Sequence, residues 1–61
     1  MNDEYGDILD YVFSSGQITS GDKNGAVDDA EVEMCVKFEA AERGLDENAA
    51  WNFAKTHIIA R

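Results

Sequence analysis

Cys35 and His57 are the two side chains of this sequence that come nearest to a catalytic pair. Each is the only residue of its type in the chain. A cysteine thiolate is a nucleophile and a histidine can serve as its base, provided that a third group orients the histidine. The sequence shows no such third group, no oxyanion motif and too few ligands for zinc. Cys35 lies between Met34 and Val36, as a small core residue does, so we expect no enzyme activity.

The stretch Asp22-Lys23-Asn24-Gly25 resembles the opening of the calcium-binding loop of EF-hand proteins, and the resemblance covers only a few residues. That family places oxygen ligands at loop positions 1, 3 and 5, a glycine at position 6 and a glutamate at position 12. Counted from Asp22, the chain supplies Asp22, Asn24 and Glu33, with Asp28 at the position of the backbone ligand. It departs from the family at three loop positions. Ala26 replaces the third ligand, Val27 replaces the glycine and Asp29 replaces the apolar residue at position 8. The resemblance implies a weak calcium-binding module as an alternative. The preferred interpretation is a glycine turn before a capped helix, with no metal and no cofactor.

Three stretches carry apolar residues at helical spacing, and they would position any site. The first covers residues 3–14. The second runs from a capping box formed by Asp28 and Glu31 to Gly44, which is suited to the left-handed conformation that ends a helix. The third begins after Asp46, its expected N-cap. The predicted fold is all-α, one small three-helix domain over residues 1–61.

Residues 14–27, between the first two helices, hold three of the five glycines and form the predicted loop. The residues before it, Tyr11 to Phe13, also favour a strand, and Gln17 to Thr19 have the composition of a very short one. The alternative fold is therefore α+β, with a short hairpin near residues 11–27 packed on two helices.

The helical spacing also predicts which side chains form the core. In the second helix the main apolar stripe consists of Ala30, Met34, Phe38, Ala41 and Leu45. We expect Phe38 and Trp51 to be core residues, because each lies on the main stripe of its helix. Tyr11 and Phe13 are expected to be exposed, because one face of the first helix cannot bury all of its apolar residues.

Charge is the strongest compositional signal. The chain has 61 residues, 13 of them acidic and 5 basic, with a formal net charge of -8. Residues 1–13 and 28–43 each have a balance of -4, and the remaining segments are neutral. This excess argues against direct contact with nucleic acid or with an anionic membrane, and it favours attraction to basic surfaces. One cysteine and an acidic start without a secretory signal pattern predict a cytoplasmic protein.

The function predicted from these features is that of a small, acidic, non-enzymatic interaction protein. It would bind a basic surface of a partner protein, such as a nucleic-acid-processing complex, as an inhibitor or modulator. In style, though not through a family motif, it is similar to the takeover and anti-defence proteins of bacteriophages. The predicted partner-binding residues are Asp3, Asp7, Asp10, Tyr11, Phe13, Asp29, Glu33, Glu39 and Glu42.

A structural homo-oligomeric subunit is the second predicted function. A chain of this size buries only ~60% of its unfolded surface and usually needs a disulfide, a metal or a partner for stability. Because neither a disulfide nor a metal site is evident, the sequence also predicts a homodimer.

Overall fold

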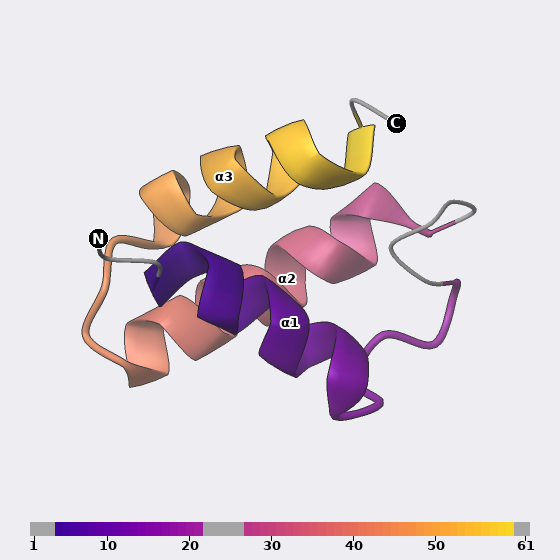
Figure 1. Ribbon diagram of the computed structural model, residues 1–61, viewed down its shortest axis with the longest axis horizontal. Helices are drawn as coiled ribbons and strands as arrows, with labels where there is room; N and C mark the ends of the chain where they lie inside the picture. Colours follow the sequence, from indigo (N-terminus) through magenta and orange to yellow (C-terminus); the bar gives the residue numbers. More distant parts are fainter. Residues whose placement is uncertain (1–3, 22–26, 60–61) are drawn as a thin grey trace.

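The fold is all-α, as predicted. The computed structural model describes residues 4–21 and 27–59, apart from the side chain of Ile59. It contains α1 (Glu4–Ser14), α2 (Asp29–Glu42) and α3 (Glu47–Ile59), and each helix packs against the other two (Figure 1). Gln17 to Thr19 are irregular, and the described part of the chain forms no strand. The alternative hairpin is therefore wrong as far as the described residues extend.

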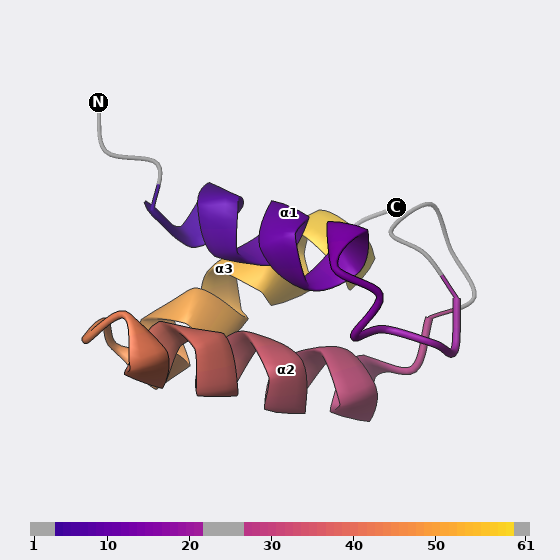
Figure 2. The same ribbon diagram turned by 90° about the horizontal axis from the view of Figure 1, so that it is seen from below.

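The described helices lie where the apolar spacing placed them. On α1 the buried side chains are Ile8, Leu9 and Val12, which share one face. On α3 the buried side chains are Ala50, Ala54 and Ile58, which also share one face. The largest interface joins α2 to α3, and α1 lies across both of them (Figures 1 and 2).

The end of α2 follows from Gly44. This glycine has a φ of 74°, which side chains with a Cβ rarely adopt. Its N–H donates to the carbonyl of Ala41 at 3.1 Å, and the N–H of Leu45 donates to that of Ala40 at 2.8 Å. This pair of bonds is the Schellman motif, which satisfies carbonyl groups that the helix leaves free. It allows α3 to begin only a few residues later.

Of the caps predicted for α2 and α3, the two N-cap residues are confirmed, whereas the reciprocal bond of the capping box is not. The Asp28 side chain accepts a hydrogen bond from the Ala30 N–H at 3.0 Å, and Asp46 accepts one from the Asn48 N–H at 2.9 Å. The capping box is wrong, because Glu31 does not reach back to the Asp28 N–H. That N–H donates to the Ser20 hydroxyl at 2.9 Å instead.

The core face of α2 is the main correction to the sequence prediction. Val32, Val36 and Ala40 are buried, whereas Met34 is 72% exposed and Phe38 is 65% exposed. The predicted core position of Phe38 is therefore wrong. The physical reason is that α2 contacts both other helices through one side, where small or β-branched residues allow a close approach. Its larger apolar residues remain outside.

Partly buried side chains, most of them aromatic, pack around this aliphatic core. Trp51 packs against the core and is only partly buried, so the prediction for it holds in part. The remaining partly buried hydrophobic residues in contact with the core are Tyr5, Phe13, Val27, Cys35, Leu45 and Phe53. Ile18, in the loop after α1, is buried with the helix residues and fixes the loop to the core.

Candidate functional site

The acidic residues of α1 lie on its solvent side. Asp7 and Asp10 are exposed, while the buried residues of the helix occupy the opposite side. Asp3, the third predicted residue of this group, lies outside the described residues. Since Glu4 is also exposed, α1 presents three acidic residues and no basic one to solvent.

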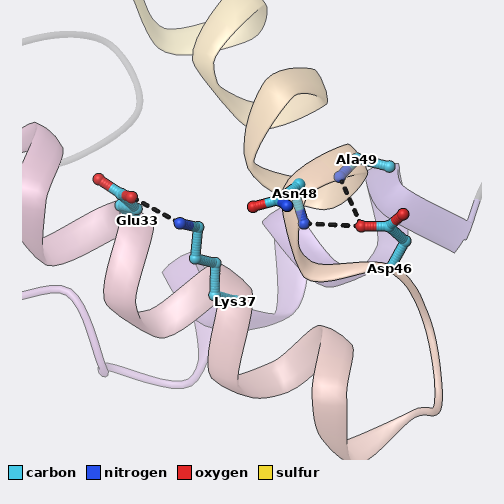
Figure 3. Close-up of polar contacts among 5 residues, drawn as sticks. All are labelled: Glu33, Lys37, Asp46, Asn48 and Ala49. Carbon is cyan, nitrogen blue, oxygen red and sulfur yellow. Dashed lines mark hydrogen bonds and ion pairs between the residues drawn. The ribbon is translucent and has the colours of Figure 1, made fainter.

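Two of the predicted acidic residues of α2 form ion pairs within the helix. The Lys37 Nζ lies 2.7 Å from the Glu33 Oε2. Figure 3 draws this ion pair, together with the hydrogen bonds that Asp46 accepts at the start of α3. The Arg43 Nε lies 3.0 Å from the Glu39 Oε2. Both are i,i+4 pairs, each worth about 0.3–0.5 kcal/mol of helix stability. Glu33 and Glu39 therefore add less to the outward field than Asp29 and Glu42, the exposed acidic residues of α2.

The acidic residues of α2 do not form one continuous face. A helix turns about 100° per residue, so Glu33 and Glu39 lie on different flanks of α2. The side between them that faces solvent carries the exposed residues Met34 and Phe38, with Glu42 beside them. The apolar surface that separates these acidic residues was not predicted from the sequence.

The two aromatic residues of the predicted site differ in exposure. Tyr11 is 44% exposed, and the Arg43 guanidinium carbon lies 5.5 Å from the centre of its ring. A guanidinium over an aromatic face is attracted by the ring quadrupole, and this contact joins α1 to the end of α2. Phe13 is partly buried and packs against the core. The predicted exposure is thus confirmed for Tyr11 and wrong for Phe13.

Cys35 and His57 occupy environments that do not activate a thiol. Burial raises the pKa of the Cys35 thiol, and the negative charge of Glu31 raises it further. His57 is exposed on α3, stacks on Phe53 at a centroid distance of 4.2 Å, and has its Nδ1 2.9 Å from the Phe53 carbonyl oxygen. A thiol with a raised pKa is mostly protonated at neutral pH and is a poor nucleophile.

The residues of the EF-hand-like stretch are used in other ways where the structure describes them. Asp28 caps α2, and Glu33 pairs with Lys37. Asp22 and Asn24 lie outside the described residues. Within residues 4–21 and 27–59, no group of three or more acidic, histidine or cysteine side chains is arranged to hold a metal ion.

Glu31 makes the densest polar contacts of the described chain. Its carboxylate accepts hydrogen bonds from the Thr19 N–H at 3.2 Å and the Ser20 N–H at 3.0 Å, and from both hydroxyl groups. We call this set of contacts, from Thr19 and Ser20 to Glu31, the Glu31 tether. The Ser20 hydroxyl bond, followed by the bonds from the two N–H groups, lowers the pKa of Glu31 to about 2. The tether fastens the loop after α1 to the first turn of α2.

Sequence reasoning assigned Glu31 to the capping box, so it missed the role of this residue in the loop. The available signal was a pair of hydroxyl residues, Thr19 and Ser20, in a loop that must return to the start of α2. Such residues readily donate to a nearby carboxylate. Their distance in sequence from Glu31 hides the contact from any local motif.

Comparison of the chain with protein-family models, with curated proteins and with solved structures finds no match. None of the described helices is both long enough and apolar enough to cross a membrane. Function must therefore be argued from the surface itself.

Proposed function

We propose that this chain is a small, acidic, non-enzymatic binding protein that attaches to a basic surface of a partner protein. The observation that carries the proposal is the uneven placement of exposed charge. The acidic excess lies on α1 and α2, whereas α3 carries Glu47 and Lys55, which cancel. A charge distribution that served only solubility would have no reason to leave one helix neutral.

Surfaces that bind nucleic acid are basic, and they are the class of surface that we propose as the target. Phosphate groups attract clustered lysine and arginine, and an acidic helix presents negative charges at a comparable spacing. One i,i+4 step along a helix rises ~6 Å, and two phosphate steps along one DNA strand rise about 6.8 Å. The proposed role is that of an inhibitor or modulator, which occupies the basic surface of a nucleic-acid-processing complex and excludes its substrate.

The surroundings of Cys35 support a binding role over a catalytic one, because a thiol whose pKa is raised is not an activated nucleophile. The homodimer predicted from the sequence stays a prediction. Sedimentation equilibrium at rising protein concentration tests it directly, with 6.7 kDa as the mass of one chain.

The test of the proposed function is affinity capture from a lysate of the source organism, at low salt and at several-fold higher salt. The bait is the wild-type chain or the double variant Asp7→Lys with Asp10→Lys, both substituted at exposed positions. Identification by mass spectrometry should give a basic protein that the wild type retains only at low salt and that the double variant does not retain. Exposed charge attraction is screened beyond ~8–10 Å at physiological ionic strength.

A single pair of variants supplies the matched control. Asp7→Lys and Glu47→Lys each replace an exposed acid in the first turn of a helix and change the net charge by the same amount. If the acidic face of α1 is the site, Asp7→Lys weakens capture much more than Glu47→Lys. Equal effects of the two substitutions would show that the acidic face of α1 is not the site. A captured partner that is indifferent to salt and to both substitutions would disprove the proposal.

A further inference from the structure

The solvent side of α2 carries an apolar row that the core does not use. The row consists of Ala30, Met34, Phe38 and Ala41, and we call it the α2 stripe. All four residues are exposed, Met34 at 72% and Phe38 at 65%. In Figure 2 one side of α2 is turned away from both α1 and α3, as this exposure requires.

The composition of the α2 stripe is that of a contact surface. Single exposed hydrophobic residues are common, but Met34 and Phe38 are one helical turn apart and therefore adjacent. Methionine and phenylalanine are enriched at protein interfaces. The two alanines on the same side leave room for close approach of another element. Of the three large exposed hydrophobic residues among the described ones, two belong to this row.

Negative charge borders the α2 stripe. By the rotation of about 100° per residue, Glu31 and Glu42 follow one edge of the stripe, and Lys37 with its ion-pair partner Glu33 follows the other. Within Asp29–Glu42 the helix has five acidic residues and one lysine, a balance of -4. The single lysine is already paired, at 2.7 Å. A partner that binds the α2 stripe therefore contacts apolar residues along its centre and a net negative charge along its borders.

A second copy of this chain fits that surface poorly. Antiparallel pairing that places Met34 against Phe38 of the second copy is the self-complementary arrangement. It also places Glu42 next to Glu31 of the second copy, twice across the two-fold axis. Like charges at such positions repel, and each chain adds a formal charge of -8. Charge complementarity thus favours a basic occupant.

We propose that α2 is the element that enters the partner, with Phe38 and Met34 as its anchors. The partner site is an apolar groove or helix face bordered by lysine or arginine, which face the exposed Glu42. This inference rests on the proposed function, since it specifies the basic surface as one with an apolar centre. It corresponds to helix-in-groove recognition, in which residues at i and i+4 supply the anchors.

The test uses two fluorescent synthetic peptides and the full chain. One is an 18-residue peptide with leucine and lysine at the spacing of an amphipathic helix, and the other has the same composition in scrambled order. Binding is measured by anisotropy at low and high salt for the wild type, Phe38→Ala, Met34→Ala and the control Asn52→Ala. Asn52 is an exposed residue of α3 and belongs to neither the α2 stripe nor the predicted acidic surface. Thermal unfolding of each variant verifies that it is folded.

We expect the wild type to prefer the amphipathic peptide. Phe38→Ala and Met34→Ala should each weaken that binding by about tenfold or more, with Asn52→Ala close to the wild type. If binding is sensitive to salt but Phe38→Ala binds as the wild type does, Phe38 is not an anchor and the proposed function is kept. If binding is insensitive to salt but Phe38→Ala abolishes it, Phe38 is an anchor and the proposed recognition of a basic surface is wrong. If neither peptide binds, both are wrong. A wild-type dimer that Phe38→Ala converts to a monomer would overturn the inference in favour of a second copy.

Discussion

Val36 and Phe38 lie two positions apart on α2 and have opposite environments. Val36 is 1% exposed and Phe38 is 65% exposed. Burial of apolar surface contributes roughly 25 cal/mol per Å², so the smaller of the two residues contributes more to the free energy of folding. Size alone is therefore a poor guide to which residue holds this small domain together.

Val36→Ala should lower the free energy of unfolding by about 2 kcal/mol, because it removes two buried methyl groups and leaves a cavity. Phe38→Ala should change it by less than about 0.5 kcal/mol, as surface substitutions usually do. Urea unfolding followed by circular dichroism gives both values. A larger loss for Phe38→Ala than for Val36→Ala would mean that the burial assigned to α2 is reversed.

The sequence could not decide between the two sides of α2, since both are apolar. Val32, Val36 and Ala40 form one row and Met34, Phe38 and Ala41 form another. Helical spacing alone marks both as candidates for the core. The choice depends on how closely α1 and α3 approach, which is a property of three helices together. On α3 the buried row is Ala50, Ala54 and Ile58, and Trp51, which was expected in the core, is only partly buried beside it.

The Glu31 tether should make the free energy of unfolding depend on pH. Its pKa is about 2 in the folded chain against an ordinary value of 4.5, because Ser20 and Thr19 donate to the charged form. A carboxylate with a lowered folded pKa stabilises the fold above its unfolded pKa, and this contribution is lost as the pH falls through the folded value. Glu31→Gln should therefore be less stable than the wild type at pH 7, and the difference should shrink between pH 4.5 and about pH 2.

Glu33→Gln is the matched control for this measurement, since it removes a neighbouring carboxylate whose partner is Lys37. It should cost only about 0.3–0.5 kcal/mol, the usual value of an exposed i,i+4 pair. Thermal melts of the three proteins at several pH values supply the comparison. If Glu31→Gln and Glu33→Gln follow the same course, the Glu31 tether does not stabilise the fold.

At the scale of elements, the link between α2 and α3 depends on one backbone conformation. Gly44 has a φ of 74°, and a Cβ built there meets no atom within 4 Å. A larger side chain at position 44 would therefore not clash with a neighbouring atom. The cost of replacing Gly44 arises from its backbone conformation. The left-handed conformation costs roughly 1–2 kcal/mol for a residue with a Cβ.

Gly44→Ala should lower the free energy of unfolding by about 1 kcal/mol, and Gly44→Asn by less, because asparagine tolerates the left-handed region. Denaturant unfolding at constant m-value measures both. Equal stability of Gly44→Ala and the wild type would imply that α2 ends differently in solution. The end of α2 was predictable because it depends on the single residue Gly44. The Glu31 tether was not, because Ser20 lies 11 positions and Thr19 lies 12 positions before Glu31 in the sequence.

At the scale of the whole molecule, net charge opposes folding. A formal charge of -8 on 61 residues produces self-repulsion that is stronger in the compact state. The melting temperature should therefore rise with sodium chloride up to a few tenths molar, where screening is largely complete. A melting temperature that falls with salt would indicate that the ion pairs of α2 outweigh the repulsion.

The unequal connections between the helices have a consequence for the order in which the chain folds. α2 and α3 share the largest interface and are joined through the short turn at Gly44, whereas α1 is joined to α2 through residues 15–28. Closing the shorter connection loses less chain entropy, and contacts that are local in sequence form faster. We expect the α2–α3 pair to be formed in the folding transition state, with α1 docking afterwards.

Ala54→Gly should then slow folding, and Ile8→Val should mainly speed unfolding. Stopped-flow measurements that show the reverse would place α1 in the nucleus.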